Sequence, residues 1–173
     1  MGNLHFRLMA WSLKLRDLFL ARELILQEVR IYAGYVILDF GCGAGSYSIP
    51  AAQMVGPEGK VYALDIHPLA GRMVQKAAAK KSLKNIETIC SDCATGLKDA
   101  SVDVVLLCDT FHWLTDRYAV LKELHRVLKP NGILLFNDHL MKEAQILSDV
   151  TVGGLFGLSR KGKRTYTFVK QES

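Results

Sequence analysis

One segment constrains the fold of this chain more than any other: an apolar run that contains an acid and leads into three alternating glycines. Residues 36–40 read Val-Ile-Leu-Asp-Phe, and Gly41, Gly43 and Gly45 follow. A continuous apolar run is typical of a strand buried in a parallel sheet. Glycine lets the backbone turn sharply and approach a ligand with no Cβ in the way, and a helix after the loop would present unsatisfied N–H groups there. The segment therefore predicts a nucleotide-type ligand at one edge of a parallel sheet.

The spacing of the glycines separates the candidate ligands. The dinucleotide fingerprint G-x-G-x-x-G/A needs glycine or alanine where this chain has Ser46, and Gly45 comes one residue early. A Walker phosphate loop is excluded because no Gly-Lys-Ser/Thr follows. The pattern that fits is acid-x-G-x-G-x-G, which begins at Asp39. It resembles the first motif of class I S-adenosylmethionine-dependent methyltransferases.

Four further apolar runs follow in an order that supports this resemblance. They cover residues 61–65, 86–92, 102–109 and 132–137, and the first three end in an acid. Helices are predicted over 47–54 and 119–128, and the Leu-Lys-Pro-Asn-Gly sequence at 128–132 ends the second helix. Residues 121–132, Leu-Lys-Glu-Leu-His-Arg-Val-Leu-Lys-Pro-Asn-Gly, closely resemble the same segment of the methyltransferase type 11 group, which includes small-molecule and quinone methylating enzymes.

Apolar runs that alternate with helical stretches predict an α/β fold with helices on both faces of the sheet. Residues 155–160 and 165–170 read as two strands joined by a basic turn, and they resemble the antiparallel pair that closes the class I methyltransferase sheet. We expect a Rossmann-like, mostly parallel seven-stranded sheet with a C-terminal antiparallel hairpin. With 173 residues, of which 50% are hydrophobic, the chain supports one such domain over 24–173.

The segment before that domain, residues 1–23, is predicted to be a helical extension. Its apolar and aromatic stretch over 6–20, with basic residues interspersed, is compatible with a helix packed on the core, a lid over the acceptor pocket, or an interfacial helix on a membrane. The resemblance favours a packed helix that serves as a lid, because N-terminal helices often cover the active site in this family.

Composition and charge bound the location and the partners. No charge-free apolar stretch of about 18 residues occurs, and Arg7, Lys14 and Arg16 interrupt any signal-peptide centre, so we expect a cytoplasmic protein with no membrane insertion. The net charge of +5 raises the question of nucleic acid. Because the basic residues fall into two separate groups with few aromatic residues among them, solvated faces are favoured over a nucleic-acid groove. These residues are Lys76, Lys80, Lys81 and Lys84 on the helix before the third strand, and Arg160, Lys161, Lys163 and Arg164 near the C-terminus.

No metal is expected. Cys90 and Cys93 form a C-x-x-C, but a second ligand pair at zinc spacing is missing, and Cys42 and Cys108 stand alone. We expect the four cysteines to be small, partly buried residues near the strand ends.

The resemblance implies S-adenosylmethionine as the cofactor and S-adenosylhomocysteine as the product, and it implies which residues would bind them. The amino-acid end would lie over the glycine loop with Asp39 near its ammonium, and Asp65 would accept both ribose hydroxyls. Ile66 would face the adenine, Asp92 would accept from the adenine amine, and the Cys93 N–H would face the ring. Each acid has an alternative role as a helix N-cap or turn former. The predicted cofactor-binding residues are Asp39, Gly41, Cys42, Gly43, Gly45, Asp65, Ile66, Asp92, Cys93 and Asp109.

The acceptor side carries two candidate general bases. His112 lies in Asp-Thr-Phe-His-Trp over 109–113, and His139 follows the fifth strand at the same sheet edge. Each has an alternative role as a local hydrogen-bonding residue, and a thiol or activated carbon acceptor needs no strong base. The Asn/Asp-Pro-Pro-aromatic motif of enzymes that methylate exocyclic or amide nitrogens and the Pro-Cys pair of cytosine-carbon methylation are both absent.

We therefore expect an S-adenosylmethionine-dependent methyltransferase that acts on a small-molecule acceptor. Two alternatives remain: an RNA or protein methyltransferase that uses the basic faces, and a non-catalytic cofactor-binding subunit of a complex.

Overall fold

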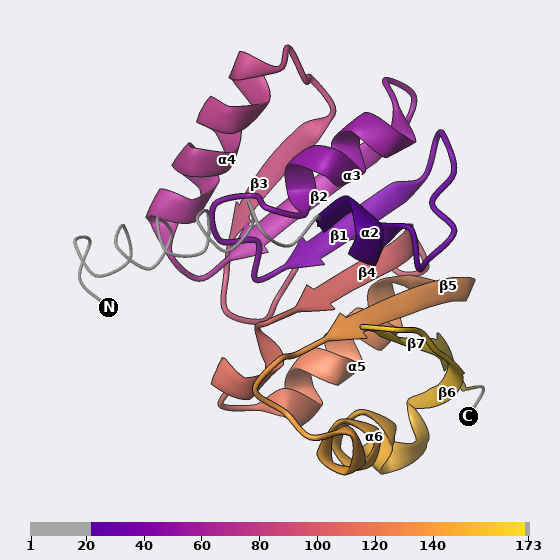
Figure 1. Cartoon of the computed structure of the whole chain (residues 1–173). Helices are drawn as coiled ribbons and strands as arrows, with labels where there is room; N and C mark the ends of the chain where they lie inside the picture. Colours follow the sequence, from indigo (N-terminus) through magenta and orange to yellow (C-terminus); the bar gives the residue numbers. More distant parts are fainter. Residues whose placement is uncertain (1–21, 172–173) are drawn as a thin grey trace.

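Seven strands form one mixed sheet in the order β3-β2-β1-β4-β5-β7-β6 (Figure 1). The structure is a computed structural model, and it describes residues 22–171. β1 to β5 pair in parallel, and β7 pairs antiparallel with both β5 and β6. The strands are β1 (Val36–Phe40), β2 (Lys60–Asp65), β3 (Ile86–Cys90), β4 (Val102–Cys108), β5 (Leu128–Asn137), β6 (Phe156–Lys161) and β7 (Tyr166–Lys170).

Helices cover both faces of this sheet. Helices α2, α3 and α4 pack on one face, and α5 and α6 pack on the other. Two short 3₁₀ turns, η1 and η2, follow β4 and α6. The bounds are α2 (Arg22–Leu26), α3 (Ser48–Val55), α4 (Pro68–Lys80), η1 (Phe111–Trp113), α5 (Arg117–Val127), α6 (Glu143–Thr151) and η2 (Val152–Gly154).

The central strands are apolar throughout because both of their faces are covered. On β4, Leu106 packs in the core beneath α2 and α3, and its neighbour Leu107 packs in the core beneath α5 and α6; both are fully buried. Successive side chains of a strand point to opposite faces, so a strand covered on both sides needs an unbroken apolar run. This is the physical reason for the continuous runs in the sequence.

The strand order reverses next to β1. The chain passes from β1 outward to β2 and β3, and then returns to place β4 on the other side of β1. In open α/β sheets of this kind ligands bind at the carboxyl ends of the strands, at the point where the order reverses. The carboxyl ends of β1, β2, β4 and β5 therefore define where a site belongs.

The predicted fold class is confirmed, with small changes at element boundaries. The second predicted helix begins earlier, at Arg117, because the Asp116 carboxylate accepts the Ala119 N–H at 2.9 Å as an N-cap. β5 begins at Leu128, which pairs with Val102 before a register shift. Helix α4 ends at Lys80, so Lys81 and Lys84 lie in the turn beyond it and not on the helix.

The predicted lid over residues 1–23 lies outside the described residues except for Arg22 and Glu23, and it stays a prediction. Within residues 22–171, no helix combines the length and the apolar character that crossing a membrane requires.

Candidate functional site

The glycine loop joins β1 to α3 and is tied to the end of β2. The N–H groups of Gly41 and Cys42 both donate to the Leu64 carbonyl, at 2.8 and 2.9 Å. The Gly45 N–H donates to the Cys42 carbonyl at 2.9 Å, which closes the turn. Backbone hydrogen bonds to β2 and within the turn therefore define the shape of the loop.

Two of these glycines are needed for different reasons. Gly41 has φ 82°, and a Cβ there would lie 2.2 Å from Thr110 Oγ1, so the loop packs directly against the segment after β4. Gly43 has φ 52°, and a Cβ there would meet no atom within 4 Å. The backbone at Gly43 is thus open on the side where a side chain would project, which gives a ligand room to approach it closely.

Asp65 holds this open part of the loop in place. Its Oδ2 accepts the Gly43 N–H at 2.9 Å, and its Oδ1 accepts the His67 N–H at 2.8 Å. A carboxylate oxygen has two acceptor positions, so each oxygen keeps one for a further donor. Next to it, the Ile66 side chain is 70% exposed, which places an apolar surface beside the carboxylate. Together these groups can hold a ligand that carries hydroxyl donors and a flat apolar part.

Asp39 lies beneath the loop rather than in the open. Its side chain is buried, and the Ser48 hydroxyl at the start of α3 donates to Asp39 Oδ2 at 2.5 Å. Burial raises the pKa of Asp39 to about 7, the nearby Asp65 charge adds to this shift, and the Ser48 hydrogen bond opposes it. The structure therefore gives Asp39 a partner inside the protein.

The residues after β3 form an exposed rim. Asp92 is exposed and accepts no hydrogen bond from the described residues. The Cys93 N–H, predicted to face a ring, donates to Ser91 Oγ at 3.3 Å. All four cysteines are free thiols, and burial raises the pKa of the Cys42, Cys93 and Cys108 thiols.

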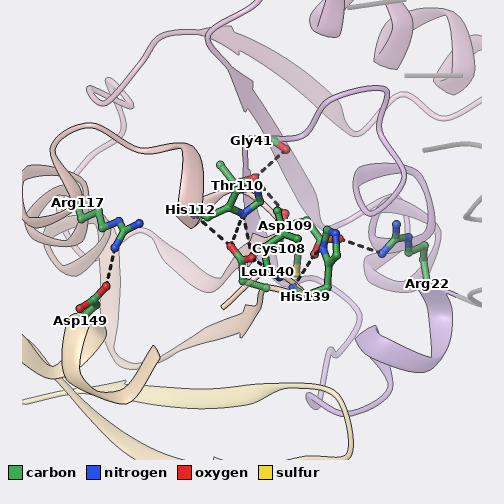
Figure 2. Close-up of polar contacts among 11 residues, drawn as sticks. Arg22, Gly41, Cys108, Asp109, Thr110, His112, Arg117, His139, Leu140 and Asp149 are labelled. Atoms are coloured by element: carbon green, nitrogen blue, oxygen red, sulfur yellow. Dashed lines mark hydrogen bonds and ion pairs between the residues drawn. The ribbon is translucent and has the colours of Figure 1, made fainter. Parts of the chain in front are cut away.

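A second group of side chains gathers after β4 and β5. Asp109 has φ 53°, and its carboxylate lies 2.7 Å from His139 Nδ1 and 3.5 Å from Arg22 Nη1. Figure 2 shows Asp109 between these two partners, which come from the segment after β5 and from α2. The Asp109 carboxylate is thus positioned by His139, which was a predicted site residue, and by Arg22, which was not.

His112 is held by an acid that the sequence did not single out. Its Nδ1 lies 2.8 and 2.9 Å from the two oxygens of Asp138, whose side chain is fully buried, and its N–H donates to the same carboxylate at 3.2 Å. The Leu140 N–H donates to this carboxylate as well, at 3.1 Å. Because a carboxylate oxygen accepts, this geometry places a proton on Nδ1, and in the neutral imidazole Nε2 is then the acceptor. The sequence signal that could have identified Asp138 is its position directly after a parallel strand.

Thr110 connects the two groups. Its hydroxyl lies 3.0 Å from the Cys108 carbonyl and 3.4 Å from the Gly41 carbonyl, so the residue bridges the glycine loop and the segment that carries His112 (Figure 2). The rings of His112 and His139 are 6.2 Å apart, which places both candidate bases at one point of the sheet edge.

A cavity of about 410 Å³ opens beside His139. Asp109, Asp138 and His139 line it together with residues of α2, of α6 and of the turn between β6 and β7. Possible metal-ligand atoms of these three residues lie within 4.8 Å of one another. However, the Asp109 carboxylate already pairs with His139, and the Asp138 carboxylate pairs with His112. Hydrogen bonds therefore account for this cluster.

The predicted site residues thus fall into two adjacent groups. Asp39, the glycine loop, Asp65 and Ile66 lie at the ends of β1 and β2, with Asp92 and Cys93 on the rim after β3. Asp109, His112 and His139 lie after the ends of β4 and β5, and Asp109 and His139 line the cavity. Arg22, Thr110 and Asp138 join the second group without having been predicted.

One family model and several known proteins resemble this chain. The family model, described as "Methyltransferase domain", matches residues 38–136, from β1 to β5. The demethylmenaquinone methyltransferase of Geobacillus stearothermophilus is 33% identical over 113 residues, which cover 65% of this chain and 48% of that protein. The protein of Sulfolobus acidocaldarius named "Probable cobalt-precorrin-6B C(15)-methyltransferase (decarboxylating)" is 43% identical over 68 residues, which cover 39% of this chain and 35% of that protein.

The chain thus spans about half the length, or less, of these curated relatives. A solved structure agrees over a greater length. A SAM dependent methyltransferase from Aquifex aeolicus has a TM-score of 0.75 at 28% identity, covering 86% of this chain and 88% of that one.

Proposed function

We propose that this chain, which belongs to the class I S-adenosylmethionine-dependent methyltransferase family, binds S-adenosylmethionine and transfers a methyl group to a small-molecule acceptor. The observation that carries the proposal is the open backbone at Gly43, held by Asp65 at the point where the strand order reverses. When bound, the cofactor supplies an electrophilic methyl group on a good leaving group, so the protein contributes mainly by positioning.

The first group of residues fits this cofactor. The open side of Gly43 suits its amino-acid part, the remaining acceptor positions of Asp65 suit the ribose hydroxyls, and the exposed Ile66 suits the adenine. The role predicted for Asp39 is better replaced by an indirect one, since its carboxylate is buried and bonded to Ser48. We assign it to holding α3 against the loop.

The second group fits an acceptor that loses a proton. His112 keeps Nε2 as an acceptor because Asp138 fixes the proton on Nδ1, so His112 can take a proton from a hydroxyl or amine. The adjacent cavity of about 410 Å³ is within the size range of small-molecule sites. The names of these two relatives refer to small-molecule acceptors, which supports the same class.

Calorimetric titration with S-adenosylhomocysteine tests the proposal, with a nicotinamide dinucleotide as the control ligand. We expect micromolar binding of the first and none of the second. Binding of neither ligand, or of the dinucleotide alone, would contradict the cofactor assignment.

Two acids provide a matched pair of variants for this titration. Asp65→Asn should weaken the binding of S-adenosylhomocysteine by about 1.5 to 3 kcal/mol, because charged hydrogen bonds to the ribose are lost. Asp103, near the start of β4 and away from the site, also accepts a backbone N–H, from Val36 at 2.8 Å, and it pairs with Lys129, so Asp103→Asn is a control for the loss of a charged acceptor elsewhere in the protein. If both variants bind as the wild type does, the role of Asp65 is wrong.

A further inference from the structure

Positively charged side chains form much of one wall of the cavity beside His139. Two carboxylates line it, those of Asp109 and Asp138. Four positively charged side chains line it as well: Arg22, Lys161, Lys163 and Arg164. Three of the four come from the end of β6 and the turn that follows it, so the positive charge is concentrated on the hairpin side.

Part of this charge is already paired. Arg22 contacts Asp109, and Lys161 forms an ion pair with Glu143 of α6. By contrast, Lys163 and Arg164 are exposed and their side chains contact no acid within residues 22–171. The two cations nearest the tip of the hairpin are therefore available to a ligand.

The turn that carries these two cations is held in one shape. Glu28 accepts the Thr165 hydroxyl at 2.7 Å and the Arg164 N–H at 3.3 Å, and the Gly162 N–H donates to the Thr165 carbonyl at 2.8 Å. A Cβ at Gly162 would lie 1.9 Å from Glu28 Oε2, so a larger residue there would displace the Glu28 carboxylate from the turn. The Asn137 side chain at the end of β5 donates to the Arg164 carbonyl. A backbone fixed in this way lowers the ordering cost of binding a charged group.

The remaining walls separate this charge from the reactive side. Ile25, Met141 and Ile146 give the cavity an apolar part, while His139 and Asp109 form the polar edge next to His112. A compound that fills the cavity therefore meets Asp109 and His139 on one side, apolar surface along its body, and unpaired cations on the hairpin.

We infer that the acceptor carries an anionic oxygen group, a carboxylate or a phosphate, which Lys163 and Arg164 bind while its nucleophile lies at the edge formed by Asp109 and His139, next to His112. This inference rests on the proposed function, because it names the class of compound that the same site methylates. Arginine and lysine on a fixed turn recognise such groups through charged hydrogen bonds.

Three aromatic probes of similar size test the inference in the presence of S-adenosylhomocysteine: 4-hydroxybenzoate, 4-hydroxyphenyl phosphate and the neutral 4-hydroxybenzyl alcohol. Backbone amide shifts of residues 161–166 report binding by NMR. We expect at least one anionic probe to bind about tenfold more tightly than the neutral one, and whichever anion binds better identifies the carboxylate or phosphate class. Added salt should weaken the anionic probes selectively.

The double variant Lys163→Gln and Arg164→Gln should remove this preference, while Lys81→Gln with Lys84→Gln, in the turn after α4, should leave it unchanged. Both variants should retain the wild-type affinity for S-adenosylhomocysteine, since neither changes the glycine loop or Asp65. Equal binding of the three probes, no binding of either anion, or an undiminished preference in the first variant would overturn the inference. Failure of the wild type to bind S-adenosylhomocysteine would instead count against the proposed function.

Discussion

Asp39 and Asp65 end neighbouring parallel strands, yet their environments differ in a way that pH will reveal. Asp65 is half-buried and accepts two backbone N–H groups, while Asp39 is buried with one hydroxyl partner. Burial raises the pKa of Asp39 from 3.8 to about 7, so between these values the folded state binds a proton that the unfolded state has lost. Stability must then fall as pH rises through this window and level off above it.

Asp39→Asn should remove this dependence, because asparagine keeps an acceptor for Ser48 but carries no charge. The difference in free energy of unfolding between variant and wild type should move in favour of the variant by about 4 kcal/mol between pH 4 and pH 8. Urea unfolding of both proteins across that range measures it. A constant difference at all pH values would show that Asp39 ionises normally.

Asp138 offers a test of positioning that needs no acceptor. Asp138→Asn replaces a carboxylate that only accepts with an amide that can also donate, so His112 should lose its preference for the Nδ1-protonated form. Nitrogen-15 NMR of the imidazole reads the tautomer directly. Once an acceptor is known, turnover should fall by roughly 10²-fold or more with unchanged cofactor affinity. A wild-type His112 protonated on Nε2 would contradict the assignment.

At the scale of elements, the contact between the glycine loop and Thr110 should be sensitive to one added methyl group. Gly41→Ala should destabilise the protein by about 2 to 4 kcal/mol, through the clash with Thr110 and the positive φ. Thr110→Ala should recover part of that loss, which a double-mutant cycle of urea unfolding measures. Full additivity of the two changes would mean that the loop relaxes away from Thr110.

Gly43→Ala separates binding from folding in the same loop. A Cβ at Gly43 meets no atom within 4 Å, and the same is true of Gly56 at the end of α3, which also has a positive φ. Gly56 has ψ −175°, a backbone conformation that alanine avoids, so Gly56→Ala should lose more stability than Gly43→Ala, but only Gly43→Ala should weaken the binding of S-adenosylhomocysteine. Calorimetry measures the affinity of each variant for S-adenosylhomocysteine. Equal affinities of the two variants would mean that no ligand lies over Gly43.

Elements with a strong local pattern were predictable from the sequence, and those fixed by distant partners were not. The strands were readable because burial on both faces demands unbroken apolar runs, as in β4. Helix α6 was missed because only Ile146 and Val150 of its nine residues are buried, which leaves little periodicity. The pairing of Asp138 with His112 joins residues 26 positions apart, and no local spacing encodes it.

For the whole molecule, ligand linkage provides a further test. S-adenosylhomocysteine at 100 times its dissociation constant should stabilise the folded protein by about 2.7 kcal/mol, which corresponds to a rise in Tm of about 5 to 10 °C. Thermal unfolding with and without ligand measures this shift. Asp65→Asn at the same ligand concentration should show a smaller shift, and an identical one would argue against binding at that carboxylate.

The reversal of strand order between β1 and β4 divides the molecule into two halves that can diversify separately. The residues assigned to the cofactor lie after β1, β2 and β3, and those that line the cavity come mostly from segments after β4 and from the hairpin. Changes in the hairpin turn can therefore alter the lining of the cavity while the glycine loop and Asp65 keep their contacts. Thr110 is the exception, since its contact with Gly41 makes it the position where drift in one half must be matched in the other.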